Sequence, residues 1–286
     1  MQIQEQIISA INTTLKNPIY QTMQLLNIKS ILKNANFVKK REGANPYLVV
    51  LHFVYMLVMN KKISTFINQS NDSLKKDTYY RLLQNSSYNW RKLLSLTNLK
   101  ILKLLHKVQD SSSVKVLIID DTVEGKTGKY IEGSRDALWS NKEKRNIRGI
   151  NVVSLNYSDG YSNFMLDFTI AMGNYARVKF EKFTQEVDVR TTAYKRRVEI
   201  MSGKSQIAID MVTRALKSGI YADYLLVDSW YSKPVFLAEM NKLGLKVISR
   251  IANNNKIWNF TAKEKTLNAI YEKFKKLKKE KAISLD

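Results

Sequence analysis

The sequence predicts a mixed α/β protein in which an all-α N-terminal domain precedes a mixed sheet with flanking helices. Three observations support this fold class. Apolar residues recur at helical spacing through the first 110 residues, and short apolar runs typical of strands follow after residue 113. From residue 204 onwards these runs alternate with helix-like segments. Strands joined through helices pair in parallel and strands joined by a tight turn pair antiparallel, so the sheet should be mixed.

Residues 1–110 are expected to form a helical DNA-binding domain. They carry 16 Lys and Arg against 5 Asp and Glu, and Ile3, Ile7 and Ile11 begin the helical spacing. Within this half, residues 61–90 have the pattern of two short helices joined by a polar turn. The second helix would present Tyr79, Tyr80 and Arg81 to a DNA groove. Any basic helical hairpin has the same pattern, so that alternative stays open.

The strands and helices of the second half have a recognisable order. A linker at 109–114 precedes strands at 114–120, 150–157 and 161–170, with a hairpin turn at Asp159-Gly160. A helix at 204–218, a strand at 223–228, a helix at 233–243 and a strand at 245–251 follow. This order predicts a ribonuclease-H-like core over residues 111–260. Residues 261–286 are expected to form a basic amphipathic helix.

Composition limits the function classes. The chain has 47 Lys and Arg against 25 Asp and Glu, a formal net charge of +22, which favours a polyanionic partner such as nucleic acid. It has no cysteine and only two histidines, which excludes disulfides and thiolate sites and argues against a histidine metal site. The longest apolar stretch, near residues 46–60, is too short to cross a bilayer, and the N-terminus does not resemble a signal peptide. We therefore expect a cytoplasmic protein without membrane partners.

The stretch "VLIIDDTVEGKTGK", residues 116–129, places Asp120 at the predicted end of the first strand, and Asp228 follows the fourth. In the predicted sheet these strands are neighbours, so the two carboxylates should meet at one edge. They would repel each other unless a cation lay between them. Oxygen ligands without Cys or His select Mg²⁺ or Mn²⁺. The plainer alternative is that both aspartates face water. Asp121 points to the other face of the strand, so it is the weaker ligand candidate.

Two motifs resemble a known family. "IDDTVEGKTGK" and "YLLVDSWYSKPVF" are similar to the first two catalytic motifs of bacterial insertion-sequence transposases of the DDE type, in the IS-four-like branch. The similarity covers residues 110–260, and Asp120 with Thr122 fits the Asp-any-Thr form of the first motif. It implies two divalent ions, Mg²⁺ or Mn²⁺, and strand cleavage and transfer at the terminal repeats of double-stranded element DNA. It also implies a bacterial cytoplasmic location and is compatible with a homodimer.

One part of the family pattern is missing from the sequence. The family's third carboxylate is a Glu in a Tyr-Arg-Glu-Lys-like motif, and residues 229–286 contain no such motif. Glu264, Glu272 and Glu280 are better explained as solvated helix charges. We therefore expect a C-terminally truncated transposase that binds DNA and cleaves it barely or not at all. The alternatives are a non-catalytic DNA-binding remnant that inhibits a full-length relative, and a two-metal nuclease that completes its site in another way.

Further basic and aromatic residues of the predicted core are DNA-contact candidates. A loop expected beside the first aspartate is rich in cations that could hold a DNA backbone, and two arginines precede the 204–218 helix. A tryptophan follows the second aspartate and could stack on an unpaired base. A solvated basic face and ordinary packing explain the same residues as well. The candidates are Lys142, Lys144, Arg145, Arg148, Arg196, Arg197 and Trp230.

Overall fold

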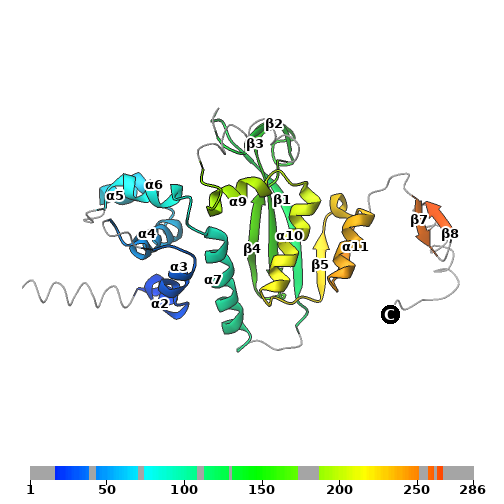
Figure 1. Ribbon diagram of the computed structural model, residues 1–286, viewed down its shortest axis with the longest axis horizontal. Helices are drawn as coiled ribbons and strands as arrows, with labels where there is room; N and C mark the ends of the chain where they lie inside the picture. Colours follow the sequence, from blue (N-terminus) through cyan, green and yellow to red (C-terminus); the bar gives the residue numbers. More distant parts are fainter. Residues whose placement is uncertain are drawn as a thin grey trace, which may run out of the picture.

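The computed structural model describes residues 17–38, 43–69, 74–107, 113–128, 131–172 and 187–250, together with the backbone of 257–260 and 263–266. A group of helices precedes a six-stranded mixed sheet, and α10 (Lys204–Lys217) and α11 (Pro234–Lys242) lie over the sheet (Figure 1). Within these ranges no helix is long and apolar enough to span a bilayer.

The N-terminal helices begin where the sequence supplies a cap. Asn17, Asn45 and Asn89 each accept a hydrogen bond from a backbone N–H of the first turn, and Pro18 and Pro46 occupy the first position of their helices. Both features favour helix initiation. Their buried core includes Leu32, Ala35 and Val49. The helices are α2 (Pro18–Leu25), α3 (Ile28–Asn34), α4 (Pro46–Val58), α5 (Ile63–Gln69), α6 (Lys76–Gln84) and α7 (Trp90–Leu105).

The sheet has the strand order β2-β3-β1-β5-β6. Strand β4 also pairs with β3, beyond the residues of β3 that pair with β2. The pairs β1–β3 and β3–β4 are antiparallel, whereas β1–β5 and β5–β6 are parallel. The parallel connections run through α10 and α11. The strands are β1 (Val116–Gly125), β2 (Arg135–Ser140), β3 (Arg145–Ser158), β4 (Asn163–Ile170), β5 (Tyr224–Val227) and β6 (Lys246–Ser249). The predicted mixed α/β, ribonuclease-H-like sheet after an all-α segment is therefore confirmed.

One face of this sheet is buried beneath the helices. Leu117 and Ile119 of β1 and Leu225 of β5 point to that face, as does every second residue of the paired β3. Met211 of α10 and Phe236 of α11 pack against them. Burying each such side chain contributes about 1.5–3 kcal/mol, so this face fixes the strand register.

Strand β1 does not end at Asp120, contrary to the sequence prediction. It continues to Gly125 and pairs with β3 from Val116↔Ser158 to Gly125↔Gly149. Only its parallel pairing with β5 stops at Ile119. The continuation requires a glycine at 149, since an added Cβ there would lie 2.3 Å from the carbonyl oxygen of Glu124.

Three further elements differ from the prediction. Strand β2 and helix α9 (Thr192–Glu199) fall in segments expected to be irregular. Residues 263–266 form strand β8, paired with β7 (Ile257–Phe260), so the helix predicted for 261–286 is wrong at its start. Residues 267–286 lie outside the described residues.

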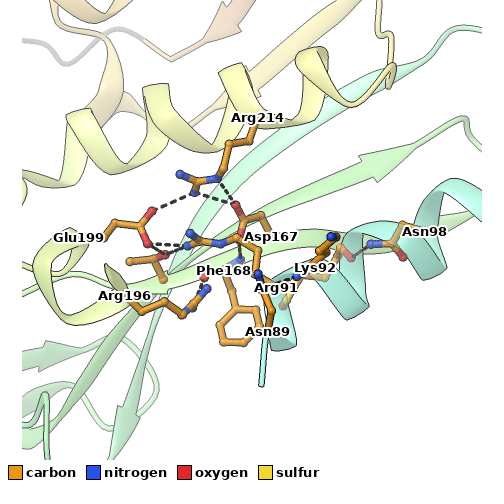
Figure 2. A network of polar contacts seen from close by, with 11 residues as sticks. Asn89, Arg91, Lys92, Asn98, Asp167, Phe168, Arg196, Glu199 and Arg214 are labelled. Atoms are coloured by element: carbon orange, nitrogen blue, oxygen red, sulfur yellow. Dashed lines mark hydrogen bonds and ion pairs between the residues drawn. The ribbon is translucent and has the colours of Figure 1, made fainter. Parts of the chain in front are cut away.

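Helix α7 joins the helical group to the sheet through a buried ionic network (Figure 2). Arg91 of α7 binds Asp167 at 2.8 Å and Glu199 at 2.5 Å, and its Nη2 donates to Thr169 at 2.8 Å. Arg214 of α10 binds the same two carboxylates at 2.7 and 2.9 Å. The network therefore connects α7, β4, α9 and α10.

Candidate functional site

Asp120 and Asp228 lie at corresponding positions of neighbouring parallel strands. The register pairs Ile118 with Leu226 and Ile119 with Val227; Asp120 is the next residue of β1, and Asp228 directly follows the end of β5. Because Ile119 and Val227 are buried beneath the helices, the residues that follow them start out towards the opposite face. Both aspartates are exposed. Both aspartates thus directly follow the last pair of the register, and the close approach of their carboxylates stays a prediction.

Each of these carboxylates is held by one backbone N–H. Asp120 Oδ1 accepts from the N–H of Asp121 at 2.8 Å, and Asp228 Oδ1 accepts from the N–H of Trp230 at 3.0 Å. The second contact caps the 3₁₀ turn η2 (Ser229–Tyr231). Within the described chain the other oxygen of each carboxylate makes no hydrogen bond. Both side chains can therefore be oriented and still offer an oxygen to a cation.

Asp121 is occupied in a different way. Its carboxylate forms an ion pair with Lys204 at 2.5 Å, and both side chains are less than a fifth exposed. Lys204 opens α10, and its ammonium lies 4.3 Å from the ring centre of Trp230 and 5.1 Å from that of Tyr231. The charge of Asp121 is thus neutralised by the protein, whereas that of Asp120 is not. This contrast favours Asp120 as the metal ligand.

Tyr231 lies at the centre of this edge. Its ring is fully buried, and its hydroxyl has no hydrogen-bond partner among the described residues. Burial raises the pKa of Tyr231, and the negative charges of Asp121, Asp228 and Asp120 raise it further. The phenol therefore stays protonated next to three carboxylates. Neither Tyr231 nor Lys204 was among the residues that the sequence predicted for the site.

The donor set suits a hard divalent cation, but it is incomplete in the described part of the chain. Asp120 and Asp228 offer carboxylate oxygens, the ligands that Mg²⁺ and Mn²⁺ prefer. Thr122, the last residue of the Asp-any-Thr motif, is exposed two positions beyond Asp120 on the same strand. No group of three or more acidic, His or Cys side chains that could hold a metal occurs among the described residues.

The three predicted DNA contacts on α6 differ in their exposure to solvent. Tyr80 and Arg81 are exposed. Tyr79 is fully buried, and its hydroxyl lies 2.9 Å from His52 Nδ1. The prediction that Tyr79 contacts DNA is therefore wrong, because this side chain belongs to the core of the helical group.

The basic turn between β2 and β3 is far from the carboxylates. Lys142, Lys144 and Arg145 are exposed, but Arg145 precedes Ser154, the partner of Asp120, by nine residues on β3. At about 3.3 Å per residue this is roughly 30 Å. Arg148 is closer, but it binds Asp136 at 2.9 Å. The prediction that these four cations lie beside Asp120 is wrong, because β1 and β3 extend well past it.

Arg196 and Arg197 make internal contacts, contrary to their prediction as DNA ligands. Arg196 donates to the carbonyl of Phe168 at 2.8 Å and lies over that ring at 5.0 Å (Figure 2). Burial, followed by the charge of Arg91, lowers its pKa to about 10. Arg197 forms an ion pair with Glu132. Arg196 holds α9 against β4, and Arg197 connects α9 to the turn that precedes β2.

Trp230 remains accessible beside the carboxylates, as the stacking prediction requires. It is 40% exposed, and the ammonium of Lys233 lies 3.7 Å from its ring centre. An aromatic ring next to cations at a site edge can contact a nucleic-acid strand.

Comparison with known proteins decides the family. A family model described as "DDE superfamily endonuclease" matches residues 63–268, which include the whole sheet and both aspartates. The chain belongs to the DDE superfamily of endonucleases. A search of curated proteins finds no match. DDE endonucleases act on DNA and generally use divalent metals such as Mg²⁺.

The structure of this DDE endonuclease differs from the sequence prediction mainly in which residues surround the two carboxylates. Asp120, Asp228 and Trp230 gather at one edge of the sheet, together with the unpredicted Lys204 and Tyr231. Lys204 was not among the residues that the sequence predicted for the site. Its contact with Asp121 spans 83 positions, so no local pattern could indicate it.

Proposed function

We propose that the chain is a DDE transposase of the IS-four-like insertion-sequence type, in which Asp120 and Asp228 hold a divalent cation at the site of DNA strand cleavage. The observation that carries this proposal is the parallel register of β1 and β5, whose last pair, Ile119↔Val227, is followed on both sides by an aspartate. Membership of the DDE endonucleases supplies the reaction class.

The residues of the edge have distinct tasks in this proposal. Asp120 and Asp228 would bind Mg²⁺ or Mn²⁺, which supplies stabilisation of charge on the attacking and leaving oxygens of a phosphodiester. The N–H groups of Asp121 and Trp230 orient these carboxylates. Lys204 keeps Asp121 paired, so that Asp121 does not compete for the cation. The buried ring of Tyr231 excludes water from beneath the edge.

DNA binding in this proposal uses both halves of the chain. Residues 1–110 form the domain that recognises the terminal repeats of the element, with Tyr80 and Arg81 on the exposed side of α6. Residues 111–260 form the catalytic core. The net charge of +22 supplies attraction to the duplex that is independent of sequence and weakens with salt. A homodimer would bring the two element ends together.

The third carboxylate of the family motif, a Glu, affects how fast the chain could cleave DNA. Because residues 229–286 contain no Tyr-Arg-Glu-Lys-like motif, we propose that the chain is a truncated copy whose cation site lacks one ligand. A displacement of about 1 Å at a reacting centre can lower a rate roughly 100-fold. Translating the DNA that follows codon 286 in all three frames tests the truncation. A Tyr-Arg-Glu-like motif there supports it, and its absence counts against it.

A second candidate function follows from the same incomplete ligand set. The chain would then be a non-catalytic DNA-binding remnant that inhibits a full-length transposase. The distinguishing experiment incubates the purified protein with a duplex carrying the element end, in Mg²⁺ or Mn²⁺. Slow 3′-end nicking that Asp228→Asn abolishes supports the enzyme. DNA binding with no nicking above that of Asp228→Asn supports the remnant, and efficient cleavage that survives Asp228→Asn contradicts the proposed site.

A further inference from the structure

A pocket of about 460 Å³ lies beside the carboxylate edge, at the N-terminus of α10. It forms where α10 begins and no longer covers the sheet. The residues that line it include Arg135, Asn151, Lys204, Ser205, Trp230 and Lys233. Three of these are cations, of which Lys204 is paired with Asp121 and Arg135 and Lys233 make no ion pair in the described chain, and none of the described lining residues is acidic. The pocket is therefore a positive recess.

Two polar groups of the pocket lack a partner in the described chain. Asn151 is 8% exposed, and its buried Oδ1 makes no hydrogen bond. The buried Nε–H of Arg135 also has no acceptor. A buried donor without a partner is costly, so such groups indicate a ligand or water. Turning the Asn151 amide by 180° exchanges its oxygen for its NH₂ group, which gives the pocket a second donor.

The start of α10 adds further donors. Gly203 caps this 14-residue helix without any side-chain hydrogen bond, and Lys204 and Ser205 form the first turn beside the pocket. The first N–H groups of a helix have no partner within the helix, and the helix dipole favours an anion there. Lys233 lies over the Trp230 ring at 3.7 Å, which holds its charge at the rim.

We propose that this pocket binds a backbone phosphate of the DNA strand whose neighbouring phosphate is cleaved at Asp120 and Asp228. The inference rests on the proposed function, since it assumes that DNA lies across the same edge. Trp230, two residues after Asp228, lines the pocket. Arg135, Lys233 and the first turn of α10 contact the phosphate oxygens, and the Asn151 amide donates from below. The pocket thus positions the strand.

The test measures affinity for a duplex carrying the element end in Ca²⁺, without cleavage. Arg135→Gln and Lys233→Gln remove one cation each, and Lys217→Gln makes the same charge change at the other end of α10. Each lost phosphate contact lowers the slope of log affinity against log salt concentration by about one. This corresponds to a roughly tenfold loss of affinity at 0.1 M salt relative to 1 M salt. We expect this loss in both pocket variants and not in Lys217→Gln. Equal effects in all three variants overturn the proposal.

A second arm locates the phosphate. A neutral methylphosphonate is placed at one linkage at a time near the cleaved position. We expect one linkage at which it weakens binding to the unmodified protein but not to the Arg135→Gln, Lys233→Gln double variant. A loss that persists in the double variant overturns the pocket assignment. Inorganic phosphate is the further probe. If it binds the unmodified protein but not the double variant, while the substitutions leave DNA binding unaffected, DNA is not the source of the bound phosphate. If the unmodified protein fails to bind the duplex, the proposed function itself fails.

Discussion

Replacing Arg91 by leucine should uncouple the helical group from the sheet. Arg91 makes contacts with Asp167, Thr169 and Glu199, which lie 76 to 108 positions away in the sequence. Its side chain is 20% exposed, and those of Asp167 and Glu199 are 8% and 10% exposed. Leucine fills a similar volume but leaves two buried carboxylates with less compensation.

The magnitude follows from what remains around those carboxylates. Breaking a buried ion pair costs about 3–5 kcal/mol because an uncompensated charge is left behind. Here Arg214 still binds both Asp167 and Glu199, so the lower end of that range applies, about 3 kcal/mol. For a chain of this size one kcal/mol lowers Tm by about 2 °C, which gives a decrease of about 6 °C.

Thermal unfolding followed by circular dichroism measures this decrease. The control is Arg190→Leu, which removes an equally close pair with Asp188 at 2.7 Å, but with Arg190 86% exposed. Exposed pairs contribute little because water screens them, so Tm should change by no more than about 1 °C. If Arg91→Leu lowered Tm by no more than the control, the network would not hold the two parts together.

Three further substitutions test the structure, each by chemical or thermal unfolding. Tyr231→Phe removes a buried hydroxyl without a described partner, so stability should stay equal or rise by about 1 kcal/mol; a clear loss would reveal a partner. Burial alone would raise the pKa of Glu199, but three arginines hold that pKa below its ordinary value of 4.5. The ionised Glu199 therefore stabilises the fold at pH values above 4.5, and this stabilisation is lost as the pH falls through the lower folded pKa. Glu199→Gln should therefore be less stable at pH 7, with a difference that shrinks below about pH 4.5; a constant difference would contradict this. Gly149→Ala places a Cβ 2.3 Å from the carbonyl of Glu124 and should cost about 1–3 kcal/mol, whereas Gly203→Ala meets nothing within 4 Å; equal costs would contradict the close approach.

The order of strands and helices, and with it the neighbouring positions of Asp120 and Asp228, could be predicted from local patterns. The paired parts of β1 and β5 are visible as the apolar runs VLII and YLLV, and crossover helices impose parallel pairing. The length of β1 could not be predicted, because its second half is polar and depends on pairing with β3. That same extension carries Arg145 away from the carboxylates.

Side-chain partners that are distant in sequence could not be predicted either. Helical spacing shows that Tyr79 and Leu82 share a face of α6, but not that α4 covers this face and binds Tyr79 through His52. Arg196 has the composition of a basic DNA-binding face, yet it is held against Phe168 by the packing of α9. In both cases tertiary burial decides the role of a residue that local sequence leaves open.

Binding of Mn²⁺, followed by electron paramagnetic resonance, tests most directly whether Asp120 and Asp228 share a divalent cation. This measurement does not depend on catalytic activity. Asp120→Asn and Asp228→Asn should each weaken binding at least about tenfold, the lower bound found for residues that merely support a ligand. Asp121→Asn should have little effect, because Lys204 already pairs with that carboxylate. Binding that is unchanged in Asp120→Asn and Asp228→Asn, or that is lost only in Asp121→Asn, would contradict the proposed metal site.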